Sequence, residues 1–317
     1  MAMPAEKLGL PVAGIGHRPL ILADLRHTDT DLWLSMRERT LGASEVAAAL
    51  GLNPYKSPLK LYLEKMGHRE DLSGNEAVEF GVQMEGPIRL WFAKRYPVVE
   101  KFNVEVQEYP FMLRHPDHYW LSASPDGVIA HPELGVGLIE IKTASERMWR
   151  EWEADELPTM YYIQIQSQLA VTGLDYAYVV ALVGRKLLWK FVPRNDEVID
   201  QIIDLTGKWW RDHIGAKVPP APEGLPSDTA ALKLLYPEAT PDVVQLHHMQ
   251  DDYDRYKDLT AKQKELGLEI EAIKQRFMAE LGSSDTGMVG KKKVTWKMVE
   301  RKEYVVQASC SRQLRIF

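Results

Sequence analysis

Two short segments of the chain place acidic and basic side chains where they can act on one substrate. Glu140 and Lys142 lie two residues apart in the apolar run Leu-Ile-Glu-Ile-Lys, and side chains two apart on a strand point to the same face. Asp126 precedes Glu140 by fourteen residues, in a Ser-Pro-Asp-Gly turn that can bring it alongside. Two carboxylates beside one lysine suit Mg²⁺ with its water ligands. The alternative is a solvated ion pair, which Glu-x-Lys on a strand commonly forms.

Further polar side chains can extend this site. Glu85 lies in a segment with helical spacing and can add a carboxylate for the metal or its water. The alternative is an ordinary exposed helix glutamate. Three glutamines occur in an otherwise apolar helical segment, where Gln164 and Gln168 share one face and Gln166 lies on another. They can bind phosphate or water near the site, or they can simply be exposed.

Arg37 and Ser44 indicate an anion site in the N-terminal part of the chain. Arg37 lies at the end of one predicted helix and Ser44 near the start of the next. A guanidinium and a hydroxyl beside a helix N-terminus bind phosphate well. Ser124, two residues before Asp126, can join them from the strand side. The alternative is a surface arginine and a serine that belongs only to the helix start.

A mixed α/β core must position these residues. Apolar residues with helical spacing predict helices over 29–40, 42–52, 57–67, 75–95, 158–172 and 195–213. Alternating and short apolar runs predict strands within 100–142 and over 177–184 and 186–193. The order of helices, strands, helix, strands and helix is typical of an α/β fold.

The predicted helix over 75–95 has regular apolar spacing but contains a proline in its interior. Phe80, Met84, Ile88 and Phe92 recur every four residues and define one apolar face. Pro87 lacks the backbone N–H that a helix interior needs. We therefore expect a kink or a break at this proline.

The composition divides the chain into four parts. They are an N-terminal arm over 1–27, an α/β domain over 28–216, a proline-rich linker over 217–228 and a C-terminal extension over 229–317. The extension is predicted to form a long helix over 242–281 and then a strand over 291–305. The apolar residues of the long helix can pack on the α/β domain, or they can contact a second subunit or a partner.

Three consecutive lysines open the predicted C-terminal strand. Lys291, Lys292 and Lys293 are followed by Trp296, and lysines beside an aromatic ring can contact a nucleic-acid backbone and bases. The alternative is a solvated turn.

Composition and charge exclude several classes of protein. No apolar run approaches the ~18 residues of a membrane span, and the N-terminal segment lacks the apolar block of a secretory signal. The single cysteine, Cys310, excludes an intrachain disulfide framework and a cysteine zinc site. These features fit a cytoplasmic protein. A net charge of −6 argues against nucleic acid, but residues 282–317 contain eight Lys/Arg and three Asp/Glu, a local excess of +5.

The order of these motifs resembles that of the YqaJ-like viral recombinases. This group is the lambda-exonuclease-like branch of the PD-(D/E)XK nucleases. The resemblance covers roughly 29–213. It rests on Trp33, Arg37 and the segments GASEVAAALGLNPYKSPLKLYLEKMG (42–67), QMEGPI (83–88), SASPDGVI (122–129), LIEIKT (138–143) and YYIQIQSQLAVTG (161–173).

The resemblance implies a PD-(D/E)XK core and a Mg²⁺-dependent enzyme, with Mn²⁺ as a possible substitute. Such an enzyme degrades one strand of double-stranded DNA from its 5′ end. The remaining 3′ strand passes to an annealing protein of a phage or prophage recombination system in a bacterial host cell. A ring-shaped homotrimer is a further implication. The alternatives are an endonuclease or nickase with the same core, and a non-catalytic scaffold that binds DNA or a partner.

The resemblance also assigns roles to individual residues. It implies metal binding by Asp126, Glu140 and the backbone carbonyl of Ile141, with Lys142 positioning the attacking water and Glu85 assisting. One of Gln164 and Gln166 would lie near the nucleophile. The 5′-phosphate pocket would consist of Arg37, Ser44 and Ser124.

Overall fold

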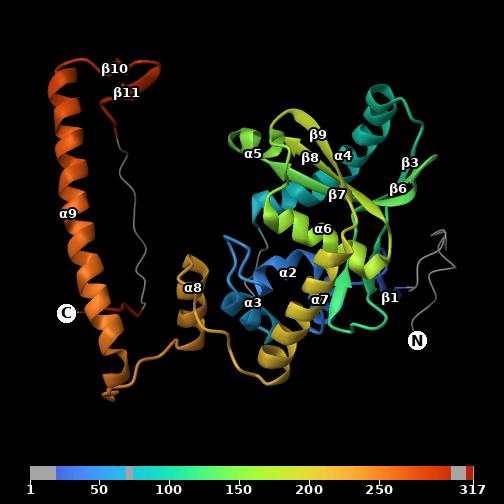
Figure 1. Ribbon diagram of the computed structural model, residues 1–317, viewed down its shortest axis with the longest axis horizontal. Coiled ribbons are helices and arrows are strands. Elements are labelled where there is room, and N and C mark those ends of the chain that lie inside the picture. The colour runs from blue at the N-terminus through green and yellow to red at the C-terminus, as the bar shows by residue number, and fades with distance from the viewer. Residues whose placement is uncertain (1–18, 69–73, 301–311, 317) are drawn as a thin grey trace. The chain divides into compact units, whose positions relative to one another are not determined.

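The computed structural model describes residues 19–68, 74–300 and 312–316 (Figure 1). The chain divides into two compact units, Met1–Tyr236 and Pro237–Phe317. The first unit contains all the predicted catalytic residues, and each unit is described by itself below.

A five-stranded mixed sheet forms the centre of the first unit. Its strands, in spatial order, are β3 (Glu105–Gln107), β6 (Gly127–His131), β7 (Gly135–Ala144), β8 (Tyr176–Val183) and β9 (Lys186–Pro193). The strands β7 and β8 pair in parallel, whereas the other neighbours pair antiparallel. Strand β8 is buried along its whole length, as expected for a central strand covered on both faces.

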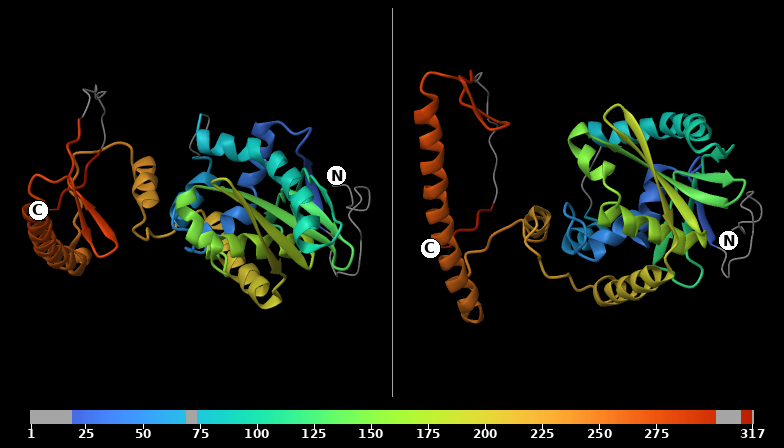
Figure 2. Two further views of the ribbon diagram at one scale, coloured as in Figure 1. Left: turned by 90° about the horizontal axis from the view of Figure 1, so that it is seen from above. Right: turned by 45° about the horizontal axis from the view of Figure 1, so that its top comes forward.

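Helices α4 (Glu76–Glu100) and α6 (Thr159–Thr172) cover opposite faces of this sheet (Figure 2). On β7, Ile139 and Ile141 pack with Phe92 of α4. Leu138, on the other face, packs with Leu169 of α6. The two-residue period of the strand therefore divides β7 between two separate apolar clusters.

A second, four-stranded sheet carries the N-terminal helices. Its order is β1 (Leu20–Asp24), β4 (Phe111–Arg114), β5 (Leu121–Ala123) and β2 (Leu41–Gly42), and β2 runs parallel to β5. Helix α1 (Thr30–Glu38) precedes β2 in the sequence, and helices α2 (Ala43–Ala49) and α3 (Pro58–Lys65) follow it. Asp29 caps α1 and Ser57 caps α3 by accepting backbone N–H bonds.

The remaining elements of the first unit close its core. They are η2 (Glu146–Met148), α5 (Trp149–Glu153), α7 (Asp196–Trp209), the π-helix η3 (Trp210–Gly215) and α8 (Pro226–Leu235). The mixed α/β core predicted from the sequence is confirmed, and so is the C-terminal extension of one long helix followed by strands.

Helix α4 differs from the expectation at Pro87. The helix continues unbroken through this proline and through Pro97. Ile88, Phe92 and Tyr96 are buried against the sheet, and this packing holds the helix across the position that lacks an N–H. Phe80, which the spacing placed on the buried face, is instead about half exposed.

The division between the two units lies later than the proline-rich segment. Helix α8 begins at Pro226, inside that segment, and Ala231 is fully buried in the core with α2 and α3. The Ser227 hydroxyl also accepts the backbone N–H of Ser57 at 3.0 Å. These contacts attach α8 to the first unit, which ends at Tyr236.

The second unit consists mainly of one helix and a hairpin. Its elements are η4 (His247–Met249), α9 (Gln250–Leu281), β10 (Thr286–Val289) and β11 (Lys292–Thr295), and the two strands pair antiparallel. The helix starts later than 242, the predicted start, and β11 is shorter than the predicted strand, whose residues 301–305 lie outside the described part. Cys310 also lies outside it. Within the described ranges, no helix has the length and apolar character that crossing a bilayer requires.

Candidate active site

Strand β7 presents Glu140 and Lys142 on one face, as their spacing predicts. The Lys142 ammonium lies 2.6 Å from Glu140 Oε1. Glu140 is only 4% exposed, and Ile141 between them packs into the cluster with α4. Two charged side chains on a central strand are costly to bury unless they are paired or used.

Asp126 lies just before the first residue of β6 and faces the same region. Its Oδ2 accepts the backbone N–H of Ile141 at 2.6 Å. Gly127 pairs with Ile139, so β6 has no residue left to pair with Ile141, and the carboxylate takes that place. Because the N–H and C=O of one strand residue point to the same side, the Ile141 carbonyl is directed to the same side of β7 as its N–H. Arg89 of α4 donates to the Asp126 carbonyl at 2.8 Å.

The protonation equilibria of the site reflect crowded negative charge. Burial, followed by the charge of Glu140, raises the pKa of Asp126 well above its usual range. Burial and the Glu140 charge also raise the pKa of Glu85. Burial alone would lower the pKa of Lys142. The negative charges of Glu140 and Asp126 outweigh this effect and raise the pKa of the ammonium. A cation bound here would therefore relieve repulsion among these carboxylates.

The donor set fits a hard divalent metal. Asp126 and Glu140 offer carboxylate oxygens, and Ile141 offers its backbone carbonyl. Mg²⁺ accepts oxygen ligands of these kinds together with waters. In the described ranges, no group of three His, Cys, Asp or Glu side chains is placed to hold a metal ion. The ion would therefore rely on two carboxylates, one backbone oxygen and water, rather than on a closed protein cage.

Two glutamines of α6 hold the Glu140 carboxylate. Gln164 Nε2 donates to Glu140 Oε1, and Gln168 Nε2 donates to Glu140 Oε2 at 2.6 Å. Gln168 was not among the residues implied by the resemblance. Its position four residues after Gln164, on the same helical face, is the sequence signal that identifies it.

Gln166 does not reach the site. Its Nε2 donates to the Pro193 carbonyl at 2.8 Å, and its Oε1 accepts the Asn195 N–H at 2.9 Å. The side chain is fully buried and joins α6 to the segment that enters α7. Of the two glutamines that the resemblance implied, Gln164 therefore lines the cleft and Gln166 lies outside it.

A cleft with a volume of about 730 Å³ contains most of the predicted site residues. Its lining includes Glu85, Asp126, Glu140, Lys142, Gln164, Gln168, Arg37, Ser44 and Ser124. The catalytic and phosphate-binding candidates therefore share one cavity. Lys291, Lys292 and Lys293 belong to the second unit, at the turn and start of β11, where they are exposed.

The parallel pairing of β2 with β5 explains why Arg37 and Ser44 line the same cleft as Ser124. Gly42 pairs with Ser122, so the turn between α1 and α2 lies beside the segment that leads to Asp126. A hydroxyl contact of 2.8 Å between Thr40 and Ser122 fixes this junction.

The β6–β7 hairpin brings Asp126, Glu140 and Lys142 together in a mixed sheet with helices on both faces, which is the arrangement that the resemblance implies for a PD-(D/E)XK core. Residues 32–175 match the family model of the YqaJ-like viral recombinase domain. This match lies within the first unit.

Two relatives extend this comparison. The chain is 29% identical to protein YqaJ of Bacillus subtilis (strain 168) over 288 residues, which cover 89% of this chain and 88% of that protein. It is 31% identical to protein R354 of Acanthamoeba polyphaga mimivirus over 153 residues, covering 45% of this chain and 27% of that protein. The similarity to YqaJ thus includes much of the C-terminal extension.

Solved structures show more distant similarity. The alkaline exonuclease LHK-Exo from Laribacter hongkongensis matches with a TM-score of 0.45 and 20% identity, covering 65% of this chain and 96% of that chain. A phage-related exonuclease from Haemophilus somnus 129PT matches with a TM-score of 0.38 and 13% identity, covering 56% of this chain and 96% of that chain.

Proposed function

We propose that this chain is a Mg²⁺-dependent exonuclease that degrades one strand of double-stranded DNA from its 5′ end. One observation carries the proposal: the triad of Asp126, Glu140 and Lys142 shares a single cleft with Arg37, Ser44 and Ser124. The first group supplies phosphodiester hydrolysis and the second supplies anion binding. The match of residues 32–175 to the YqaJ-like viral recombinase family model supports a role in phage or prophage recombination.

The proposed chemistry assigns a role to each side chain around Glu140. Asp126, Glu140 and the Ile141 carbonyl would hold the metal, which stabilises charge on the phosphate when bound. Lys142 would orient the attacking water and Glu85 would assist from α4. Gln164 and Gln168 would keep Glu140 in place, since each donates to one of its oxygens.

The proposed recognition of DNA ends rests on Arg37, Ser44 and Ser124. A terminal phosphate carries more charge and more acceptor oxygens than an internal one, and a guanidinium with hydroxyls is suited to it. Binding the 5′ phosphate would set the distance from the strand end to the metal. Such a pocket favours stepwise removal from the end over internal cleavage.

Digestion of a linear duplex labelled separately at each end, with Mg²⁺, Mn²⁺ or a chelator, tests the proposal. We expect loss of the 5′ label first, only with metal, and faster cleavage of 5′-phosphorylated than of 5′-hydroxyl ends. A closed circular duplex is the control, because an exonuclease leaves it intact. Cleavage of the circle would identify an endonuclease or nickase, and binding without cleavage would identify a non-catalytic scaffold.

The proposal extends to the partners of the enzyme. A 3′ single strand is the substrate of an annealing protein, so we propose such a protein as the partner, in the cytoplasm of a bacterial host cell. The exposed lysines 291–293 support a contact between the second unit and the DNA backbone. A homotrimer around the duplex is the proposed assembly, and sedimentation of the full chain with and without DNA tests it.

A further inference from the structure

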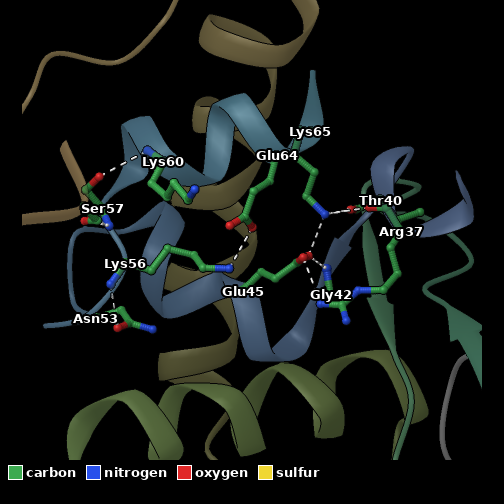
Figure 3. Close-up of polar contacts among 11 residues, drawn as sticks. Arg37, Thr40, Gly42, Glu45, Asn53, Lys56, Ser57, Lys60, Glu64 and Lys65 are labelled. Atoms are coloured by element: carbon green, nitrogen blue, oxygen red, sulfur yellow. Dashed lines mark hydrogen bonds and ion pairs between the residues drawn. The ribbon is translucent and has the colours of Figure 1, made fainter. Parts of the chain in front are cut away.

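Arg37 is part of a buried ionic network that the catalytic site does not use (Figure 3). Its Nη2 lies 2.9 Å from Glu45 Oε1. The other oxygen of Glu45 lies 2.6 Å from Lys65 Nζ and accepts the Gly42 N–H at 2.8 Å. Glu45 is 6% exposed and Lys65 is 5% exposed, so this network is shielded from water.

Lys65 connects the network to the end of α1. In addition to Glu45, it donates to the carbonyls of Arg37 at 2.6 Å and Thr40 at 2.7 Å. Lys65 belongs to α3, whereas Glu45 belongs to α2. One ammonium therefore fixes the backbone that carries Arg37, and the carboxylate that it neutralises fixes the Arg37 side chain.

The charge balance of the network explains why two cations are present. A single Arg–Glu pair is neutral and would attract an anion weakly. With Lys65, the three groups carry one net positive charge, and Arg37 is the member that lines the cleft with Ser44. Its side chain is 26% exposed, so part of the guanidinium remains accessible. The Trp33 ring, whose centroid is 5.0 Å from Arg37 Cζ, restricts the guanidinium further.

We infer that Glu45 and Lys65 are positioning residues that hold Arg37 in the orientation needed to bind a terminal 5′ phosphate. The inference rests on the proposed function, because it requires a phosphate pocket at Arg37. Neither residue lines the cleft, so both act through Arg37 rather than by touching DNA. Strong attraction from Lys65 and Arg37 outweighs the effect of burial and lowers the pKa of Glu45 to about 2, which keeps it ionised for this task.

The test measures cleavage of 5′-phosphorylated and 5′-hydroxyl duplexes by wild type, Glu45→Gln, Arg37→Ala and the double variant. We expect Glu45→Gln to lower the preference for phosphorylated ends about tenfold, through KM more than kcat. In the Arg37→Ala background, Glu45→Gln should change the preference no further, because its effect passes through Arg37.

Glu64→Gln is the matched control. Glu64 precedes Lys65 on α3 and pairs with Lys56 at 2.7 Å, so the change removes a nearby ion pair without touching Arg37 (Figure 3). It should retain the wild-type preference. Should Glu45→Gln fold poorly, Glu45→Gln with Lys65→Met removes both buried charges, and the same loss of preference is expected.

The outcomes separate the inference from the proposed function. No preference for phosphorylated ends in the wild type would contradict the pocket itself. A wild-type preference that persists in folded Glu45→Gln would overturn the positioning role alone. An equal loss of rate on both kinds of end would also overturn it, because that result indicates a purely structural contribution.

Discussion

Gln168 of α6 donates a hydrogen bond to Oε2 of Glu140 on β7, at a distance of 2.6 Å. Gln164 donates to the other oxygen, so both oxygens of this carboxylate are held from the same helix. Gln168 Oε1 is buried and has no hydrogen-bond partner among the described residues. Gln168 also lines the cleft that contains the proposed metal ligands.

We predict that Gln168→Met lowers metal-dependent cleavage about 10- to 100-fold, as expected when a hydrogen bond of ~1.5–3 kcal/mol to a charged group is lost. The similar size of methionine preserves packing, so the variant should keep the wild-type circular dichroism spectrum, although the lost hydrogen bond lowers its melting temperature. Gln166→Met is the matched control on the same helix. It should reduce stability through the lost contacts to Pro193 and Asn195 while leaving turnover near the wild-type value.

Asp126→Asn and Lys142→Met are predicted to reduce cleavage at least about 1000-fold, since each removes a charge that acts on the reacting phosphate or water. Asp126→Asn keeps an oxygen that can accept the Ile141 N–H, so the fold should be retained. Single-turnover rates and circular dichroism check both expectations. Calorimetry should show weaker Mg²⁺ binding in Asp126→Asn only, and cleavage at the wild-type rate in either folded variant would refute the assignment.

The depressed pKa of Glu45 predicts a specific pH dependence of stability. A carboxyl group whose pKa falls from 4.5 to about 2 on folding contributes about 3 kcal/mol above pH 4.5. This contribution declines as the pH falls toward 2, because the unfolded chain then binds the proton more readily. We therefore expect the difference in unfolding free energy between wild type and Glu45→Gln to shrink between pH 5 and pH 2. A constant difference across this range would contradict the ionised, buried Glu45.

The position of α8 predicts how the chain tolerates truncation. A chain ending at Tyr236 should keep the fold of the first unit and its metal-dependent cleavage, since this unit contains the whole cleft. A chain ending at 222 loses Ala231 from the core, and its melting temperature should fall by about 5 °C or more. Thermal unfolding of both proteins tests this, and equal stability would show that α8 does not belong to the core.

Much of the catalytic strand follows from local rules. Successive side chains of a strand point to opposite faces. The alternation around Glu140 and Lys142 therefore predicts that these two residues share one face and that Ile141 is buried on the other. The turn at Asp126 predicts that its carboxylate lies near Glu140 and Lys142. It does not predict the hydrogen bond to Ile141, which depends on where β6 begins. The resemblance to a known family supplied the roles that local rules cannot give.

Where the structure differs from the sequence-based expectations, the cause is tertiary packing. Helix α6 is buried around most of its circumference, so its glutamines are polar on more than one buried face. Gln166 donates to the Pro193 carbonyl, and polarity alone cannot distinguish its face from the face of Gln164 that lines the cleft. Pro87 is tolerated because neighbouring residues pack on the sheet. The position of Glu45, three residues after the N-cap Gly42, is a capping signal, but its pairing with Arg37 depends on how α1 and α2 pack.

The burial of β7 has a consequence for motion. Neighbouring strands β6 and β8 and helices on both faces surround Glu140, so the amides from Ile139 to Lys142 should be among the slowest in the chain to exchange with solvent deuterium. Glu140 and Lys142, the proposed hydrolytic groups of β7, thus lie on the most rigid part of the sheet. If the chain acts on DNA as proposed, adjustment to each nucleotide must then come from the DNA and from the α1 side of the cleft, where part of Arg37 is exposed.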